Sequence, residues 1–517
     1  MIEAGNLWEL IERRSRATPE ALFGVDESDR ELRFGEYRAA AEAAAAGLAK
    51  RGVGEGTRVS WQLPTTLDAM ILTGALARLG AVQNPILPIY RKREVGFATR
   101  QTEARLLAVP SVFRGFDHAS MAREIASDRQ ELEVLVVDGK LPDGDPASLP
   151  PPPPATAPED APVRWIFYTS GTTADPKGAL HTDQTIMSGF RAMCGRLELR
   201  ADDRVALVFP VTHIGGIGWL VIGLLCGCAH IVISAFDPKS SIEVLARHGV
   251  TQATAGTVFH QAYLTAQRAQ RERGGDRLFP KVRSFPGGGA PKPPQLHFDM
   301  KREMGGAGIV SGYGLTECPV LTMASPRDTD ASLAHTEGRA NPPAVQIKLI
   351  KLDGVAAATG EEGEIRVKGP QLFRGYLDAS LDAEAFDAEG FFRTGDLGAL
   401  DADGCIAVTG RLKDVIIRKG ENVSAKEVED LLYRHPKVED VGVIGLPDPA
   451  RGERVCAVVA CAESEDPLGF GEMVSFLKDQ GLMVQKIPEQ LEIVDEVPRN
   501  PTGKILKHEL RERYASR

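Results

Sequence analysis

Alternating strands and helices near the start of the chain constrain its fold more than any other feature. Residues 58–63 predict a strand, residues 67–79 a helix and residues 81–86 a second strand. A helix that connects two strands places them parallel in one sheet and then covers a face of that sheet. An Ala-rich stretch over residues 36–52, with charges at helical spacing, predicts another helix of this kind. The sequence therefore predicts an α/β fold, mixed α+β in detail, with helix-covered sheets.

The chain is too long for one ordinary domain, and its composition changes toward the C-terminus. Its 517 residues correspond to about three compact units by length alone. Beyond about residue 410, charged residues such as Arg411, Lys413 and Asp414 lie close together, which predicts a smaller terminal domain. Five prolines over residues 150–154 predict a stiff, exposed connector.

Charge and cysteine content exclude several functions. The 61 Lys and Arg against 71 Asp and Glu leave a formal net charge of −10, which gives no support to general nucleic-acid binding and leaves only a local basic groove open. Seven cysteines, an odd number, do not describe a disulfide framework. Cys226, Cys228 and Cys318 lack a zinc-ligand spacing, so we expect core thiols and a reducing, cytoplasmic compartment. The first residues also lack the pattern of a signal peptide.

One apolar stretch requires a choice between a membrane span and a globular core. Between Arg204 and Asp237 the only titratable side chains are two histidines and two cysteines, and five glycines interrupt the stretch. A strand over residues 205–209, a buried helix over 216–225 and a strand over 230–234 fit this pattern better than a span. We therefore expect no transmembrane span.

Hydroxyl and glycine residues follow a predicted strand near the middle of the chain. The strand covers residues 163–169, and residues 170–178 read Ser-Gly-Thr-Thr-Ala-Asp-Pro-Lys-Gly. Glycine backbone N–H groups, hydroxyls and a lysine are what a bound polyphosphate requires. The Walker pattern is absent. The residues alone therefore leave two alternatives open, a phosphate loop and an ordinary surface turn.

The stretch from Tyr168 to Gly178 resembles the signature loop of the adenylate-forming superfamily. That superfamily includes acyl-CoA synthetases, the adenylation domains of peptide synthetases and luciferases. Further motifs of the family follow in the right order, so the resemblance covers essentially the whole chain; they are residues 285–291, 311–317, 393–398, 410–414 and 498–504. The resemblance implies a large N-terminal domain over residues 1–412 and a small, mobile C-terminal α+β domain over residues 413–517.

The resemblance implies a nucleotide site that these motifs share. Tyr313 offers a ring face for adenine, and ionised Asp396 can accept both hydroxyls of a ribose. Thr316 can donate to the α-phosphate, and Glu317 is a hard oxygen ligand for Mg²⁺. The implied nucleotide-binding residues are Thr169, Ser170, Gly171, Thr172, Thr173, Lys177, Gly288, Gly289, Ala290, Pro291, Tyr313, Gly314, Asp396 and Arg411. Ordinary turns and solvated surface charges are the plainer alternatives.

The resemblance also implies a moving lysine near the C-terminus. Lys504 would reach the acyl carboxylate and the α-phosphate, where its charge offsets the repulsion between two anions. Lys413 falls at the family's hinge, about which the small domain turns. The implied CoA-binding loop consists of Arg418, Lys419, Gly420 and Glu421. A helix-flanking lysine and a solvated charge run remain the alternatives.

The acid site is the least defined part of the resemblance. His213 lies where the family has an aromatic-His motif, but Thr212 replaces the aromatic residue. We expect His213 to border the carboxylate of the acid, with a core histidine as the alternative. The other expected pocket residues are Gly216, Trp219, Thr257, Val258, Gly288 and Val320. Peptide-synthetase domains usually place an Asp here, and none lies between Asp203 and Asp237, which disfavours an amino-acid substrate.

Together these motifs predict an AMP-forming acid–thiol ligase. The expected reactants are a small carboxylic acid, ATP with Mg²⁺, and CoA, with no prosthetic group. The catalytic residues implied by the resemblance are Lys504, Glu317, Thr316 and His213. Two alternatives stay open, an acyl-AMP ligase that loads a carrier protein and a catalytically silent nucleotide-binding homologue. The sequence does not define the acid, and it leaves a homodimer open.

Overall fold

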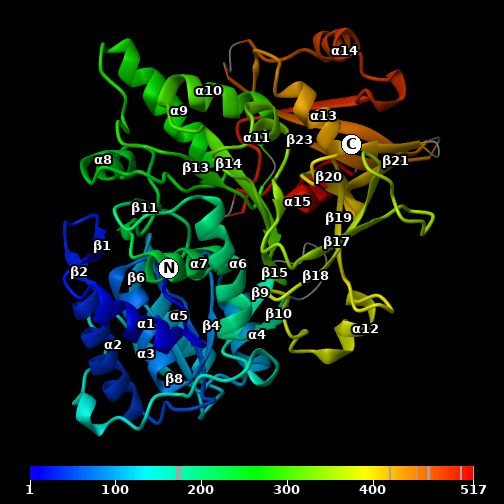
Figure 1. The fold of residues 1–517 in the computed structure, drawn as a ribbon. Helices are drawn as coiled ribbons and strands as arrows, with labels where there is room; N and C mark the ends of the chain where they lie inside the picture. Colours follow the sequence, from blue (N-terminus) through cyan, green and yellow to red (C-terminus); the bar gives the residue numbers. More distant parts are fainter. Residues whose placement is uncertain are drawn as a thin grey trace.

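A computed structural model describes residues 1–169, 176–290, 292–418, 421–449, 451–462, 466–500 and 503–515. The predicted alternation is confirmed, because β3 (Arg58–Trp61), α3 (Leu67–Leu79) and β4 (Val82–Pro85) follow one another and β3 pairs in parallel with β4 (Figure 1). Thr66 caps the start of α3 by accepting a backbone hydrogen bond, and Gly80, with φ 66°, ends it.

These elements belong to a six-stranded sheet. Its other strands are β5 (Leu106–Val109), β8 (Glu133–Val136), β9 (Trp165–Thr169) and β10 (Lys177–His181). The strand order is β10-β9-β4-β3-β5-β8. The strands β9 and β10 form an antiparallel hairpin at one edge, with Lys177 opposite Thr169, whereas the other pairs are parallel. The predicted phosphate loop therefore connects the two strands of an edge hairpin.

Helices pack around this sheet in two apolar clusters. The larger cluster includes α1 (Leu7–Ala17), α2 (Phe34–Ala49) and α6 (Asp183–Arg196), and the smaller one includes α4 (Lys92–Gln101) and α5 (His118–Ala126). The helix predicted over residues 36–52 is α2, which ends at Ala49. Trp61, Leu48 and Leu72 are buried together in the core.

The apolar stretch forms β11 (Arg204–Leu207), α7 (Ile214–Cys226) and β12 (Ala229–Val232), as predicted. Together with β1 (Leu22–Asp26) and β2 (Glu31–Arg33), these strands make a second sheet of order β11-β12-β1-β2. Glycine lets α7 approach that sheet, since a Cβ on Gly223 would collide with the ring of His230. Within the described ranges, no helix has the length and apolar content to cross a membrane.

Two further sheets, antiparallel except for the parallel pair β13–β14, follow and place the remaining motifs at turns and strand ends. The first contains β13 (Phe285–Gly287), β14 (Ile309–Leu315), β15 (Cys318–Met323) and β16 (Arg339–Ala340). The second contains β17 (Gln346–Ile350), β18 (Glu362–Lys368), β19 (Phe392–Leu400) and β20 (Ile406–Arg411). In the β14–β15 hairpin Leu315 lies opposite Cys318, so Thr316 and Glu317 form its turn. In the second unit Asp396 lies opposite Arg411.

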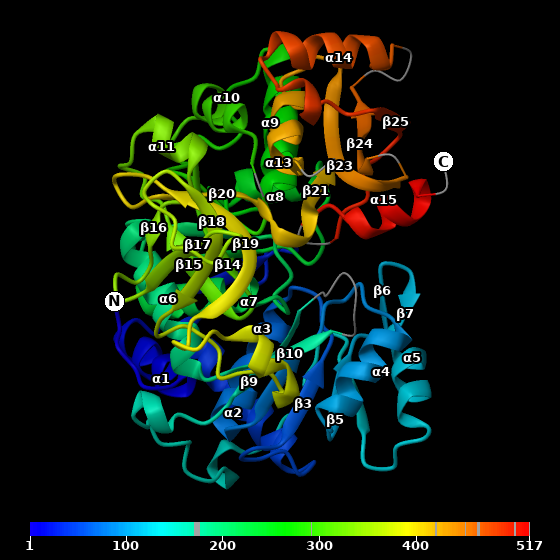
Figure 2. The same cartoon turned by 90° about the vertical axis from the view of Figure 1, so that its right-hand side faces the viewer.

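The C-terminal part has its own sheet and core, as predicted for a small α+β unit. Its strands are β21 (Val415–Arg418), β22 (Glu421–Ser424), β23 (Val438–Asp448), β24 (Gly452–Cys461) and β25 (Gln490–Val494). Its helices are α13 (Ala425–Leu432), α14 (Phe470–Asp479) and α15 (Lys507–Tyr514). Val428, Val443 and Val459 are buried in its core. Figures 1 and 2 both show this part at the end of the molecule opposite α1–α3.

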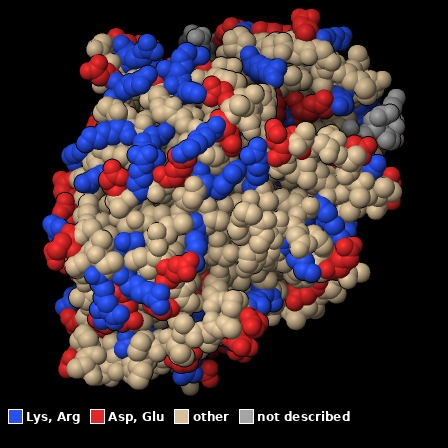
Figure 3. Space-filling view, viewed as in Figure 1, with Lys and Arg blue, Asp and Glu red and all other residues tan. Residues whose placement is uncertain are grey.

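Short elements and a charged surface complete the molecule. The remaining elements are β6 (Val112–Phe113), β7 (Phe116–Asp117), α8 (Ser240–Arg247), α9 (Thr257–Glu272), α10 (Pro294–Met304), α11 (Asp330–His335) and α12 (Asp382–Ala385). Figure 3 shows basic and acidic side chains interleaved on one face, and ion pairs such as Arg268–Glu303 (2.9 Å) join them.

The five-proline run lies on the surface, where the Pro150 carbonyl accepts from Arg78 at 2.7 Å. Cys228 and Cys318 are buried thiols, whereas Cys226, predicted as a core thiol, is partly exposed at the end of α7.

Candidate active site

A cavity of about 340 Å³ opens between the β14, β19 and β20 strands and the C-terminal sheet and helices. The predicted residues that line it are Gly289, Ala290, Tyr313, Gly314, Asp396, Arg411, Lys413 and Lys504. Its size is within the range of small-molecule sites. Lys and Arg outnumber Asp and Glu in its wall, which suits an anionic ligand. The tertiary fold thus brings together motifs that are about 200 residues apart in the sequence.

Asp396 is the centre of a polar group in this wall. Because it lies opposite Arg411 across β19 and β20, Arg411 Nε is 2.8 Å from Asp396 Oδ1, and Tyr313 OH donates to Asp396 Oδ2 at 2.7 Å. Asp396 is only 3% exposed, yet each carboxylate oxygen keeps a second acceptor direction. Burial and the nearby carboxylate raise the pKa of Tyr313 well above its usual range, so its phenol stays a neutral donor. Asp396 can therefore accept two hydroxyls without losing its protein partners.

Two glycines place bare backbone beside Tyr313. A Cβ on Gly288 would lie 2.7 Å from the Gly312 carbonyl oxygen, so any side chain there would push β13 away from β14. Gly289 has φ 82°, a conformation that other residues rarely adopt. Gly289 and Ala290 therefore line the cavity beside Tyr313 with backbone and a single methyl group.

Lys504 enters the same cavity from the C-terminal part. Its backbone N–H donates to Asn500 Oδ1 at 2.9 Å, which closes a turn with Gly503 at φ 84°. The turn lies against the first turn of α9, since a Cβ on Gly503 would be 3.2 Å from Val258 Cγ2. Burial and the cations of Arg411 and Lys413 lower the pKa of Lys504 to about 7, although Asp396 acts in the opposite direction. A bound phosphate would favour the charged ammonium.

Glu317 lies in the β14–β15 turn, near Lys177 at the C-terminal end of the phosphate loop. It is 8% exposed, and Tyr376 OH donates to its Oε1 at 2.7 Å. Burial raises the pKa of Glu317, while the Tyr376 hydrogen bond and the charge of Lys177 lower it in part. No group of three or more His, Cys, Asp or Glu able to hold a metal occurs in the part of the chain that the structure describes. One carboxylate fits Mg²⁺ when phosphates supply most other ligands.

A second, smaller pocket of about 30 Å³ lies beside the Thr316 turn, and Thr212 and His213 also line it. His213 caps α7, with Nδ1 accepting from Gly215 N at 3.1 Å. Burial lowers the pKa of His213 to about 4, so at neutral pH the ring is neutral. Because Nδ1 is the acceptor, the ring proton lies on Nε2, and His213 can only donate through that atom.

The remaining predicted residues do not converge on these two cavities. Gly216, Trp219, Thr257, Val258, Gly288 and Val320 are absent from the described lining of both. Arg418 pairs with Glu489 on the C-terminal sheet and is not among the described residues that line the larger cavity. Ser170, Gly171, Thr172, Thr173, Pro291, Lys419 and Gly420 lie outside the described residues, as does the side chain of Glu421.

Three side chains at the site were not predicted. His181 Nε2 lies 2.8 Å from the Thr316 carbonyl oxygen, and Tyr376 contacts Glu317 as described above. Lys292 is buried in the wall of the larger cavity and donates to the Thr336 carbonyl at 3.2 Å. Strand alternation from Lys177 could have indicated His181, which shares its face of β10. Tyr376 gave no such signal, because 59 residues separate it from Glu317.

Family comparisons cover both parts of the chain. The AMP-binding enzyme family matches residues 11–377, and the AMP-binding enzyme C-terminal domain matches residues 427–504. A medium-chain fatty-acid–CoA ligase of Escherichia coli is 29% identical over 519 residues, which are 98% of this chain and 90% of the relative. A salicyl-AMP ligase / salicyl-S-ArCP synthetase of Mycobacterium tuberculosis is 32% identical over 520 residues, which are 95% and 88% of the two chains.

A solved structure agrees with the whole fold. ATP-bound MatB from Rhodopseudomonas palustris aligns with a TM-score of 0.87 and 27% identity, over 99% of both chains. The predicted fold class, with a large N-terminal and a small C-terminal domain, is therefore confirmed. The family matches, the relatives and the shared fold together show that the chain belongs to the AMP-binding enzymes of the adenylate-forming superfamily, in the acyl-CoA synthetase family.

Proposed function

We propose that the protein is an ATP-dependent acyl-CoA ligase with two half-reactions. A carboxylate attacks the α-phosphorus of ATP, which forms acyl-AMP and releases pyrophosphate. The CoA thiolate then attacks the acyl carbon and releases AMP. The observation that carries this proposal is the cavity in which Lys504 faces the group of Asp396, Tyr313 and Arg411. Formation of an acyl-AMP requires an acceptor for the two ribose hydroxyls and a cation at the reacting phosphate, and this cavity contains both.

The nucleotide is held by side chains that are already oriented. Tyr313 and the backbone of Gly289 and Ala290 receive adenine, and Asp396 accepts the ribose hydroxyls. Arg411 uses its Nε for Asp396, so its remaining N–H groups can reach ribose or phosphate. Thr316 and the loop from Thr169 to Thr173 would bind the phosphates. Because Tyr313, Asp396 and Arg411 are held by one another, little of their side-chain entropy is lost on binding.

Glu317 would hold the Mg²⁺ that enters with ATP. Its buried carboxylate supplies one hard oxygen, and the phosphates supply further ligands. When bound, Mg²⁺ offsets charge on the phosphate oxygens and orients the leaving pyrophosphate. Lys177 adds positive charge at the same end of the loop, where its Nζ lies 5.2 Å above the Tyr376 ring.

Adenylation joins two anions, and Lys504 supplies the charge that makes this possible. Its ammonium would donate to the acid carboxylate and to an α-phosphate oxygen, an effect worth about 3–4 kcal/mol for one well-placed donor. His213 would orient the acid by donating from Nε2, without adding charge. The turn that carries Lys504 already lies against Val258, which supports Val258 as a wall of the acid site. Gly216, Trp219, Thr257 and Val320 stay predictions for that site.

The second half-reaction requires another domain arrangement. We place the boundary between residues 1–412 and 413–517, with Lys413 as the hinge. Lys413 lies in a short 3-10 turn, Leu412–Asp414, between β20 and β21. Rotation there would withdraw Lys504 and bring in the loop of Arg418, Lys419, Gly420 and Glu421. The pairing of Arg418 with Glu489 outside the cavity supports the adenylation arrangement for the present structure.

A carrier-protein thiol is the second candidate acceptor. The relative named salicyl-AMP ligase / salicyl-S-ArCP synthetase favours it, whereas the relative named medium-chain fatty-acid–CoA ligase favours CoA. A catalytically silent homologue is disfavoured, because Lys504, Glu317, Asp396 and Arg411 are all in place. We further propose a cytoplasmic location and, as a prediction that light scattering would test, a homodimer.

The proposal is tested with a panel of linear, branched, aromatic and alicyclic carboxylic acids. We expect acid-dependent exchange of pyrophosphate with ATP, and then release of AMP and an acyl-CoA when free CoA is added. Exchange without AMP release until a phosphopantetheinyl carrier is added would identify the second candidate. A complete absence of exchange, with ATP still bound, would indicate the silent homologue.

A further inference from the structure

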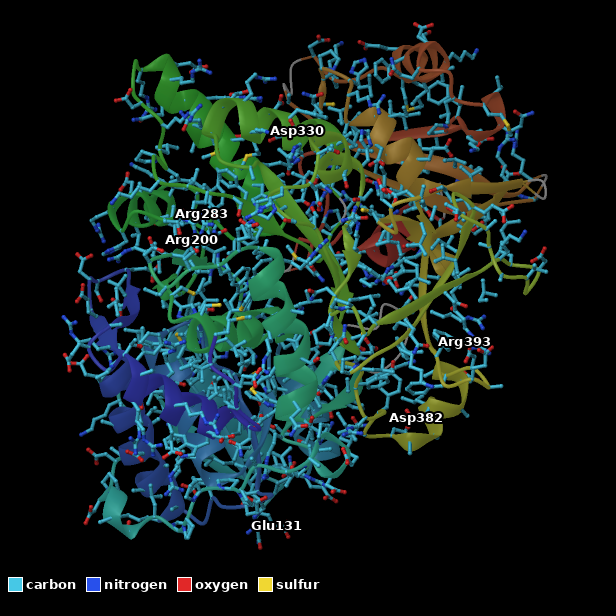
Figure 4. All side chains as sticks on the ribbon, in the orientation of Figure 1. Glu131, Arg200, Arg283, Asp330, Asp382 and Arg393 are labelled. Atoms are coloured by element: carbon cyan, nitrogen blue, oxygen red, sulfur yellow. The ribbon has the colours of Figure 1, made fainter. Side chains whose placement is uncertain are left out.

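A short segment beside β10 carries a tyrosine that the proposed mechanism does not use. Residues 374–377 run antiparallel to β10, with Tyr376 opposite Ala179. The Leu377 N–H donates to the Gly178 carbonyl at 2.7 Å, and the Leu180 N–H donates to the Gly375 carbonyl at 3.0 Å. The Tyr376 N–H donates to Oδ1 of Asp382 at 2.9 Å, and Figure 4 labels Asp382 at the start of α12. The backbone of Tyr376 is therefore held from both sides.

The Tyr376 side chain is buried between two functional groups of opposite charge. It is 5% exposed, and its hydroxyl donates to Glu317 Oε1 at 2.7 Å. Its ring lies under the ammonium of Lys177, at 5.2 Å from Nζ to the ring centroid, a cation–π arrangement. Phe373 packs edge-on against the same ring at 4.8 Å. One side chain thus contacts both the proposed metal ligand and the proposed phosphate-binding cation.

Strand alternation explains how these contacts arise. Lys177, Ala179 and His181 occupy alternate positions of β10 and so point to one face. Lys177 lies over Tyr376 at one end of that face, and His181 holds the Thr316 carbonyl at 2.8 Å at the other end. Ala179, fully buried between them, is small enough for Tyr376 to lie directly against the strand.

Without a spacer, the two charges would neutralise each other. A buried carboxylate and ammonium attract strongly, and an ion pair between them would withdraw both from a ligand. Among the described residues, Glu317 and Lys177 do not form an ion pair within 4.0 Å, although the Lys177 charge does act on Glu317. Tyr376 gives each group a separate partner, a hydroxyl donor for the carboxylate and a π face for the ammonium.

We infer that Tyr376 is a positioning residue that keeps Glu317 and Lys177 apart and ready for the divalent metal and the phosphates of ATP. This inference rests on the proposed function. It predicts that the hydroxyl acts through Glu317, whereas the ring acts through Lys177, so the two parts of the side chain have separable effects.

The experiment measures metal and nucleotide binding without turnover. Mn²⁺ binding is followed by electron paramagnetic resonance in the presence of α,β-methylene-ATP, and analogue binding without metal is followed by calorimetry. Tyr376→Phe keeps the ring and should weaken Mn²⁺ binding by about ten- to a hundred-fold, while binding of the analogue alone changes little. Tyr376→Leu should in addition weaken binding of the analogue alone, by about three- to ten-fold.

A matched control separates positioning from loss of a buried hydroxyl. Tyr37 is buried as well, and its hydroxyl donates to the Met70 carbonyl at 3.1 Å in the α2–α3 layer. Tyr37→Phe should lower the melting temperature about as much as Tyr376→Phe and leave Mn²⁺ binding unchanged. A loss of Mn²⁺ binding in both variants would show a general stability effect and overturn the inference.

A double-variant test keeps the inference falsifiable if the effect of Tyr376→Phe is partly structural. In the Glu317→Gln background, Tyr376→Phe should weaken Mn²⁺ binding no further, because its partner is already removed. An equal additional loss would show that the hydroxyl does not act through Glu317. If the unmodified protein binds neither Mn²⁺ nor the analogue, the proposed function fails; if it binds both and Tyr376→Phe binds Mn²⁺ equally well, only the inference fails.

Discussion

The larger cavity and the small pocket beside His213 differ in size and in the charge of the side chains that line them. In the cavity of about 340 Å³, charged groups are paired with one another, as Asp396 is with Arg411 at 2.8 Å. In the pocket of about 30 Å³, the carboxylate of Glu94 accepts from the Arg91 N–H at 3.1 Å, and the polar side chains beside the Thr316 turn, Thr212 and His213, are neutral. His213 is neutral there because burial lowers its pKa to about 4, and Thr212, 2% exposed, has a hydroxyl without a partner among the described residues.

Under the proposed function, this difference assigns a separate part of the reaction to each region. Paired charges hold a fixed geometry for a ligand that is always the same, as expected of a nucleotide site. Neutral donors such as His213 and Thr212 impose no charge on a ligand beside them, so under the proposed function shape and packing would decide which acid enters. Variants in the two regions should therefore change different kinetic constants, and four predictions test that separation.

The largest effect is expected at Lys504. Lys504→Ala removes the cation between two anions and should slow acyl-AMP formation by about 100- to 1,000-fold. Thioester formation from supplied acyl-AMP should persist, because Lys504 leaves the site before that step. The measurement is ATP–pyrophosphate exchange beside single-turnover thioester formation. Lys486→Ala is the control, since Lys486 lines the same cavity but pairs with Glu427 at 2.6 Å. Equal loss of both half-reactions would count against separate roles.

The next effect is expected at Asp396. Asp396→Asn removes a charged acceptor, so the KM for ATP should rise by about ten- to a hundred-fold while the KM for the acid changes little. Steady-state kinetics with each substrate varied in turn measures this. Asp414→Asn breaks a similar ion pair in the same cavity, Asp414–Arg511 at 2.8 Å, and should leave the ATP KM near its original value. A matching rise in the acid KM would remove the distinction between the regions.

The pH dependence of adenylation should follow Lys504. Its pKa of about 7 in the free protein means that the ammonium is lost as pH rises above that value. The kcat/KM for ATP in the exchange reaction should therefore fall on the alkaline side, by up to about ten-fold per pH unit. Lys504→Arg stays charged and should flatten this limb of the profile. An unchanged profile in that variant would assign the limb to another group.

The smallest effect is expected at His213. His213→Ala removes the Nε2 donor and should lower kcat/KM for the acid by about three- to ten-fold, with little change in the ATP KM. It also removes a helix cap, which lowers the free energy of unfolding by about 1 kcal/mol. Thr66→Ala removes the cap of α3, away from the site, and should produce only the stability loss. A similar kinetic loss in both variants would mean that His213 acts through the fold alone.

Part of the wall of the larger cavity was predictable from the sequence, because local motifs carry its polar side chains. Asp396, Arg411, Tyr313 and Lys504 were each recognised within a short run of residues, and the structure places all of them on one cavity. The acid side was less predictable. Gly216 and Trp219 lie on α7 and Val320 on β15, as parts of elements whose packing no single motif describes. The helix and strand pattern around them was predictable, but the shape of the space that they enclose was not.

By itself, the sequence determined the α/β alternation, the order of the motifs and the residue types that suit a nucleotide, because turns, caps and strand patterns depend on neighbours in the chain. Only the tertiary structure decided which distant residues meet. The hydrogen bond from Tyr376 to Glu317 joins positions 59 residues apart, and that from His181 to Thr316 joins positions 135 apart. Such contacts depend on the register of β10 against its neighbours and on burial, which set the geometry and the pKa values of the site.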